Sequence, residues 1–118
     1  MFYGCTSLTT APALPAETLA LSCYYEMFYG CTSLTAAPVL PADRLRSNCY
    51  QGMFYGCTSL NAVTCLATHI NVTDCTTSWL YNAGRDVTGT KTFTTPSSTN
   101  WSTGPNGIPS SWTRVNAE

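Results

Sequence analysis

The chain has 118 residues, with five Lys and Arg against six Asp and Glu, and a formal net charge of −1 at pH 7. This length suits one domain. Because a charge near zero creates no positive field, the composition argues against nucleic acid or an anionic membrane surface as a partner. No apolar stretch is long enough to span a bilayer, and the first residues lack the features of a signal peptide.

One eight-residue phrase organises the first two thirds of the chain. Met-Phe-Tyr-Gly-Cys-Thr-Ser-Leu begins at Met1, Met27 and Met53, which sets a period of 26 residues. A fixed period in this range is typical of stacked repeat proteins, in which each unit buries its apolar face against the next. We predict repeats over 1–84, with units 1–26, 27–52 and 53–78 and a degenerate restart at 79, followed by a separate segment over 85–118.

The first half of each unit has the spacing of a short strand. Apolar residues recur at positions 8, 11 and 13 of every copy, and alternation at 11 and 13 suits a strand with one inward face. The residues predicted to face outward are Thr10, Pro12, Ala36, Pro38, Ala62 and Thr64. Since proline removes a ladder donor, we expect short or irregular strands.

The second half of each unit has the spacing of a helix. Pro15 and Pro41 suit a first helical turn, and Glu17 and Asp43 follow, where negative charge is favourable. An apolar stripe then recurs at i, i+4 and i+8. Its members are Leu19, Cys23 and Met27 in one copy and Leu45, Cys49 and Met53 in the next. Glycines just after the stripe, at 30 and 56, suit a left-handed helix stop, and the parallel crossovers should be right-handed.

The repeated phrase, with its aromatic, Gly-Cys and Ser-Leu in this order before the strand, resembles the BspA-like leucine-rich repeat of bacterial surface proteins, also found in phages. The match covers residues 1 to about 83. The resemblance implies an α/β fold: a right-handed leucine-rich-repeat solenoid of strand–helix units stacked as parallel rungs, with a loop-rich C-terminal cap. It also implies surface adhesion or binding, with no catalytic residues and no cofactor.

The chain has seven cysteines, and most of them recur with the 26-residue period. This periodicity favours buried thiols acting as small hydrophobic residues. Six form two columns, Cys5, Cys31 and Cys57, then Cys23, Cys49 and Cys75, and Cys65 takes an inward strand position. Disulfides between column neighbours, or from Cys23 to Cys31 and Cys49 to Cys57, are the alternative. A zinc set of Cys57, Cys65, His69 and Cys75 lacks close CxxC pairs, and His69 falls in the exposed Glu17/Asp43 column. We therefore predict neither a metal site nor a Cys–His nucleophile.

The third copy changes after residue 66. Asn71 replaces the helix leucine, so Ile70 is expected to take over its packing after a small register shift. Residues 74–82 are predicted as a helix end in which Trp79 replaces Met. A last strand is predicted within 88–94, and Asn106-Gly107 is the strongest turn signal of the polar segment that follows.

Aromatic residues offer two interpretations. Trp101 and Trp112 are predicted to cap the last core face, the alternative being a ligand platform. The column Tyr3, Tyr29 and Tyr55 is predicted to pack between rungs with its hydroxyls at the surface, the alternative being a glycan-binding strip. Both predictions place aromatic side chains at the ends and flank of the stack.

These features predict a non-catalytic extracellular or cell-surface module that binds a protein or glycan. The candidate ligand contacts are Thr10, Pro12, Ala36, Pro38, Thr64, Trp101 and Trp112. The alternative is a structural spacer or tip in a surface protein or a phage fibre, which would place the chain in a virion. An enzyme is least favoured, because the chain has one His, no phosphate loop and no paired carboxylates outside the repeat columns. The open first repeat is expected to be continued by further repeats or covered by another chain.

Overall fold

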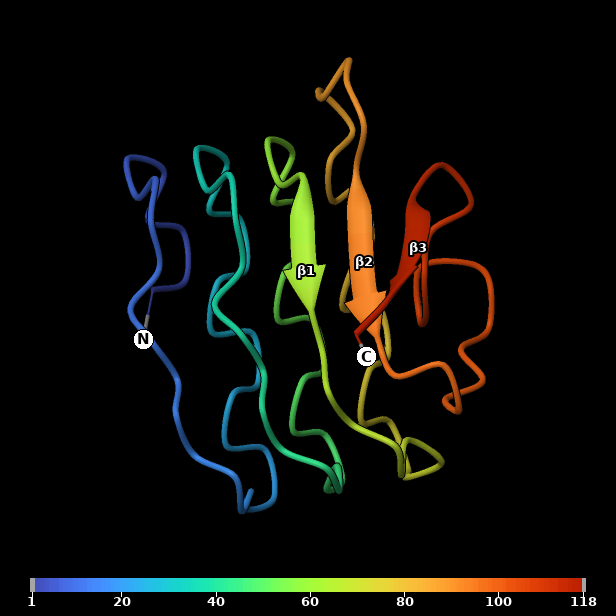
Figure 1. Ribbon diagram of the computed structural model, residues 1–118. Helices are drawn as coiled ribbons and strands as arrows, with labels where there is room; N and C mark the ends of the chain where they lie inside the picture. Colours follow the sequence, from blue (N-terminus) through green and yellow to red (C-terminus); the bar gives the residue numbers. More distant parts are fainter. Residues whose placement is uncertain (1, 118) are drawn as a thin grey trace.

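The computed structural model describes residues 2–117. Met1, where the first predicted repeat unit begins, and Glu118 lie outside the described residues. Three strands form one parallel sheet in the order β1-β2-β3: β1 spans Ala62–Thr64, β2 Thr92–Thr95 and β3 Thr113–Asn116. The rest of the described chain forms loops and turns that stand side by side as coils (Figure 1).

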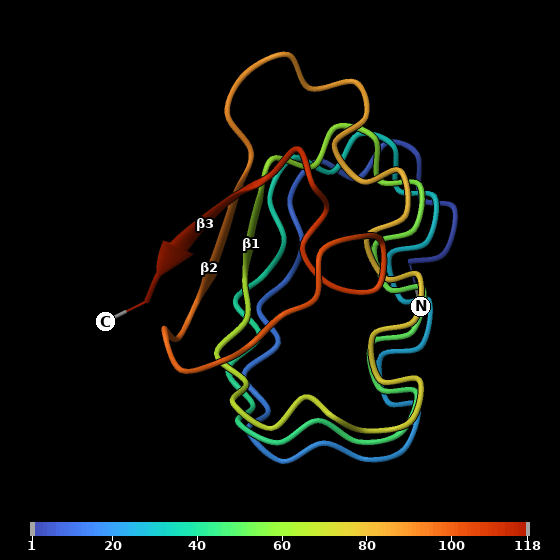
Figure 2. The same ribbon diagram turned by 90° about the vertical axis from the view of Figure 1, so that its right-hand side faces the viewer.

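Successive copies of the repeat lie against one another in register. Isolated parallel bridges join Thr10 to Ala36 and Ala36 to Ala62, each pair 26 positions apart. Rings follow the same offset: Phe2, Phe28 and Phe54 stack with centroids 5.5 and 5.7 Å apart. Seen along the stack, the coils of the first three copies nearly superimpose (Figure 2). Equal residues of the three copies therefore lie in columns.

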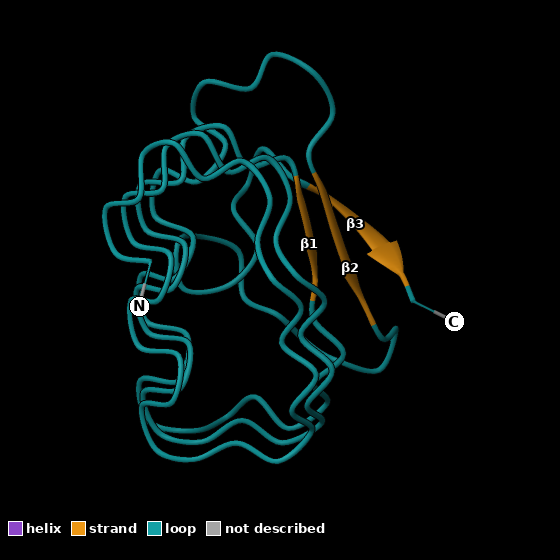
Figure 3. Ribbon diagram, turned by 90° about the vertical axis from the view of Figure 1, so that its left-hand side faces the viewer, coloured by secondary structure: helices purple, strands orange, loops and turns teal. Residues whose placement is uncertain are grey.

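The predicted helices are absent from residues 2–117, and the predicted right-handed leucine-rich-repeat solenoid of strand–helix units is wrong (Figure 3). Continuous turns occupy 21–30, 47–56 and 73–86 instead. The described fold is a small globule of turn-rich coils carrying one three-stranded parallel sheet. Pro15 and Pro41 accordingly begin no helix, and Glu17 and Asp43 face no helix dipole.

A left-handed residue at every fourth position explains the turns. These residues are Ser22, Glu26 and Gly30, then Asn48, Gly52 and Gly56, then Asp74, Ser78 and Asn82. Between them, one amide closes a tight turn and the next bonds to the adjacent coil: Tyr25 N donates to Ser22 O, whereas Tyr24 N donates to Cys49 O. A helix would instead send each amide to the carbonyl four residues earlier. Both structures place i, i+4 and i+8 on one side, so the apolar stripe alone does not distinguish them.

Proline decides where the strands form. The central strand position is Pro12 in the first copy, Pro38 in the second and Thr64 in the third. Only the third copy carries a strand, β1, and it is the copy in which threonine stands where the other two have proline, a residue that is disfavoured within sheets. The strands are parallel, as predicted, and the strand predicted within 88–94 is present as β2, beginning later, at Thr92. Strand β3 has no counterpart among the predicted elements.

A one-residue slip corrects the predicted outward face of the second copy. Ala36 pairs with Ala62, but Leu40 pairs with Cys65, so the sequence offset between paired residues falls by one between these two bridges. Because side chains alternate between faces, an extra residue between two pairs reverses the facing of the residues after it. Pro38, predicted outward, is buried, and Val39, predicted inward, is 54% exposed. After the Arg44–His69 bridge the third copy has one extra residue, which restores the original offset. Ile70, in this part of the third copy, packs against the core as predicted.

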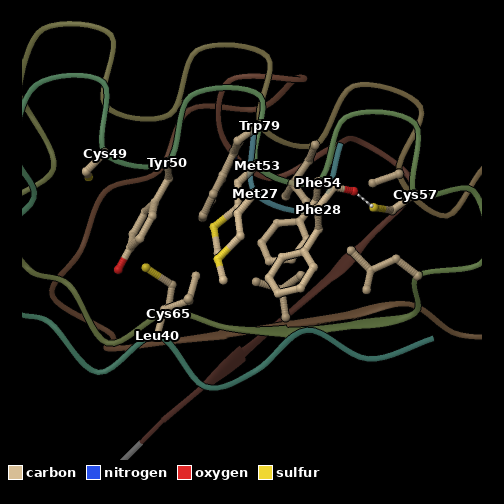
Figure 4. Packing of buried hydrophobic residues seen from close by; sticks show 14 of the residues in the cluster. Met27, Phe28, Leu40, Cys49, Tyr50, Met53, Phe54, Cys57, Cys65 and Trp79 are labelled. Carbon is tan, nitrogen blue, oxygen red and sulfur yellow. Dashed lines mark hydrogen bonds between the residues drawn. The ribbon is translucent and has the colours of Figure 1, made fainter. Parts of the chain in front are cut away.

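The core lies between the sheet side and the turns. Figure 4 shows Met27 against Met53 and Phe28 against Phe54, with Tyr50 beside Trp79, all of them buried. Trp79 replaces Met as predicted, and it lies within a column of rings, where it stacks on Tyr50 at 5.9 Å and on Trp101 at 5.2 Å. In the last coil, the indole ring of Trp79 therefore fills the core position that the smaller side chains of Met27 and Met53 fill in the earlier copies.

The segment 101–109 covers the last coil by completing its hydrogen bonds. Leu80 N donates to Pro105 O, Ser78 N donates to Asn106 Oδ1 at 2.7 Å, and the Trp79 indole N–H donates to Gly107 O. The turn predicted at Asn106-Gly107 is present and supplies these acceptors. This segment thus takes the place of a further coil.

Candidate functional site

An apolar groove lies over the proline-containing corner of the first two coils. Its volume is about 490 Å³. The lining residues are Ala11, Ala13, Leu14, Pro15, Glu17, Pro38, Val39 and Pro41. Leu14 and Pro38 are buried, whereas Val39 is exposed, as are Ala13 and Pro15. Proline restricts the backbone around the groove, so a ligand meets a surface that loses little conformational freedom on binding.

The structure separates the predicted contact residues of the strand face. Thr10 and Ala36 are exposed and joined by a backbone bridge, and Pro12 is exposed next to the groove. Pro38 lines the groove, but from a buried position. Thr64 is half-buried within β1 and pairs with Thr94. The register slip exposes Val39 at the groove instead. The sequence signals a shift only at Ile70, in the third copy, and not at Val39 itself.

The two C-terminal tryptophans belong to the packed end of the core, as the capping interpretation predicted. Trp101 stacks on Trp79, meets Phe93 edge-on at 5.2 Å, and donates from its indole nitrogen to Thr95 Oγ1. Trp112 is buried. With their rings engaged in this way, neither offers the open face that a ligand platform requires.

Four tyrosines form an exposed ladder along one flank of the stack, which includes the predicted column. Tyr3, Tyr29, Tyr55 and Tyr81 stack with ring centroids 4.7, 4.5 and 4.9 Å apart. Partial burial, and then the neighbouring phenols, raise the pKa of Tyr29. Because each inner ring is covered on both faces by its neighbours, the ladder presents edges to solvent, and a free ring face is left only at its ends. Tyr81 is missing from the predicted column, although its 26-residue offset from Tyr55 is visible in the sequence.

All seven cysteines are free thiols, and five of them are buried. Cys57 Sγ donates to Phe28 O at 3.0 Å (Figure 4). Cys31 Sγ donates to Phe2 O at the same distance, so the contact repeats along the column. Burial raises the pKa of Cys57 and Cys65 to about 12 and that of Cys49 to about 11. The buried-thiol prediction is confirmed for these residues, whereas Cys23 is exposed at the edge of the first coil.

The single histidine takes part in a polar cluster at the surface. His69 lies at the surface, where its Nδ1 is 3.5 Å from Asp43 Oδ2. The Thr68 hydroxyl donates to Asp43 and, with His69, holds the pKa of that carboxyl below its usual range. Within residues 2–117, no group of three or more His, Cys, Asp or Glu side chains is arranged to hold a metal ion.

No family model, curated protein or solved structure matches the chain. The resemblance to BspA-like repeats therefore remains a prediction, and the strand–helix fold that it implies is wrong for this chain. Among the described residues there is also no helix that could cross a membrane. Function is accordingly inferred from the surfaces.

Proposed function

We propose that the chain is a non-catalytic binding module that holds an apolar segment of a partner protein in the groove at its proline corner. One observation carries this proposal: seven of the eight residues that line the groove are apolar, although the groove is open to solvent. Exposed apolar surface in a concave site favours ligand binding because a ligand removes that surface from water.

The groove favours a protein segment over a glycan. Its lining offers no hydroxyl or amide side chain, and Glu17 is its one charged group. A sugar would leave its hydroxyls without side-chain partners there, whereas an apolar side chain loses nothing by entering. A basic residue next to that apolar side chain would meet Glu17. We place this binding outside the cell or at its surface, or on a virion, with no nucleic acid as partner.

A second candidate function is a structural spacer, favoured by the continuity of the stack. Backbone hydrogen bonds and stacked rings join each coil to the next from Phe2 to Tyr81, and outside the one-residue slip they keep the same offset. Such a ladder resists bending because every coil is tied at several points. Light scattering separates the two functions: a spacer that works as an assembled tip forms an obligate oligomer, whereas a binding module is also folded as a monomer.

The direct test is selection of displayed random peptides on the intact chain, followed by measurement of affinity for the selected peptides. Val39→Arg places a charged side chain over the groove, and Val115→Arg, on exposed β3, is the matched control. We expect apolar peptides whose affinity falls about tenfold or more with Val39→Arg and is unchanged with Val115→Arg. Peptides that bind both variants equally, or glycans that bind in this groove, would contradict the proposal.

A further inference from the structure

A second concave site lies where the tyrosine ladder meets the segment that covers the last coil. Its volume is about 320 Å³, at the small end of the range of roughly 300–1,000 Å³ found for small-molecule sites. Its lining includes Tyr81, Arg85 and Lys91. The capping segment and the residues that follow it contribute Pro105, Pro109, Ser110 and Ser111. The site is remote in sequence from the groove of the first two coils.

Tyr81 lines this site, and Tyr55 is the one ring that stacks on it among the described residues. The two rings have centroids 4.9 Å apart and planes 18° apart. In each coil, backbone amides donate to carbonyls of the following coil, and the amide of Leu80 donates to Pro105 O in the same way. The capping segment therefore lies next to the coil that contains Tyr81, on the side away from Tyr55. Tyr81 itself is 43% exposed.

The charged groups in the lining are both cations. Arg85 Nε lies 3.3 Å from Asp86 Oδ1, which leaves the two Nη groups of the guanidinium for another acceptor. Lys91 Nζ donates to Gly84 O at 3.2 Å, a contact that uses one of its three N–H groups and holds the ammonium at the site. Asp86, the nearest carboxylate in sequence, is absent from the lining. The site therefore complements an anion beside a flat apolar ring.

We propose that this site binds a carboxylate-bearing pyranose ring, the uronic-acid unit of an acidic polysaccharide. The apolar C–H face of the sugar lies against Tyr81, and its carboxylate is bound by Arg85 and Lys91. Ser110 and Ser111 supply hydroxyls for the sugar hydroxyls. An aromatic carboxylate satisfies the ring face and the cations but leaves these serines unused. The proposal does not depend on the proline groove and holds whether or not that groove binds a protein.

The test is a titration of the isotopically labelled full chain with an oligoglucuronate, followed by NMR and calorimetry, with a neutral oligoglucose and benzoate as comparison ligands. The variants are Tyr81→Ala and Arg85→Glu, and the latter reverses a charge on an exposed side chain, so the fold is kept. Matched controls are Tyr25→Ala, an exposed tyrosine outside the site, and Arg114→Gln, whose guanidinium binds Pro96 O.

We expect oligoglucuronate to shift the signals of Tyr81 and Lys91, and to bind about tenfold or more tightly than oligoglucose. Tyr81→Ala and Arg85→Glu should each reduce that affinity about tenfold, and the controls should leave it unchanged. Absence of binding, equal binding of the neutral sugar, or tighter binding of benzoate would overturn the proposal. Since Tyr81→Ala removes a stacked ring, Arg85→Glu decides the outcome if that variant unfolds.

Discussion

Gly52→Ala gives opposite changes in stability for a helix and for the observed turns. In the predicted helix, Gly52 would be an interior position before the stop at Gly56, where alanine stabilises by about 0.5–1 kcal/mol. In the structure its φ is +61°, a left-handed conformation that costs a residue with a Cβ about 1–2 kcal/mol. The new Cβ would also lie 3.0 Å from Glu26 Cγ, a flexible side chain that has to move.

We therefore expect Gly52→Ala to reduce the free energy of unfolding by about 1–2 kcal/mol. For a chain of this length, each 1 kcal/mol corresponds to roughly 4 °C in Tm. Thermal and urea unfolding followed by tryptophan fluorescence measure the change, because Trp79 is fully buried. Glu26 also has a positive φ, so Glu26→Ala, which removes Cγ but keeps a Cβ at that φ, is the suitable second change. The effect of Gly52→Ala measured in the Glu26→Ala background contains the backbone cost without the side-chain contact, so it separates the two causes.

Gly89→Ala is the matched control, because Gly89 has no positive φ and no atom within 4 Å of an added Cβ. There alanine should be neutral or stabilise by up to about 1 kcal/mol through the unfolded chain. If Gly52→Ala raised Tm as much as Gly89→Ala does, the left-handed turn at Gly52 would be refuted and the helix restored.

Four further predictions concern the core, the thiols and the cap. Tyr50→Phe should raise the free energy of unfolding in urea by about 1 kcal/mol, since it removes a buried hydroxyl that has no hydrogen-bond partner; a loss would mean that a partner exists. A thiol reagent should label Cys23 and then Cys5 in the native chain, with the other five cysteines reacting only on unfolding; fast labelling of all seven would contradict the burial. The unfolded chain releases thiol protons near pH ~8.5, whereas the folded chain holds two of them to about pH 12, so the urea midpoint should fall as pH rises above that lower value. Asn106→Ala removes the acceptor of Ser78 N and should cost about 1 kcal/mol in thermal unfolding, an effect that Asn100→Ala, outside the cap contacts, should not reproduce.

The sequence was sufficient for features that arise from the repeat itself. Equal residues at a 26-residue spacing predicted the columns, and the structure places Phe2, Phe28 and Phe54 in one of them. The same spacing predicted the buried cysteines, and proline in two copies predicted that their strands would be short or irregular. These properties are local or periodic, so side-chain size and the missing proline N–H were enough to predict them.

The helices were predicted wrongly because a four-residue spacing of apolar side chains serves turns as well as helices. A neglected signal stood beside it: glycine, asparagine, aspartate or serine recurs at every fourth position, apart from Glu26, and these residue types tolerate a positive φ. Interpreted together with Gly52, which lies between the stripe residues Cys49 and Met53, that spacing argues for consecutive turns. The cost of left-handed residues is offset only when the amides between them donate to carbonyls of the adjacent coil. The sequence of a single copy does not reveal these hydrogen bonds.

The sequence alone determined that three copies stack in register, because identical side chains at a fixed interval pack best against themselves. Tertiary structure decided the rest: the one-residue slip that exposes Val39, the edge β3, and the meeting of Tyr81 with Lys91 and the capping segment. Each of these depends on which backbone hydrogen bonds a coil finds in its neighbour, and that choice is made only when distant segments are brought together.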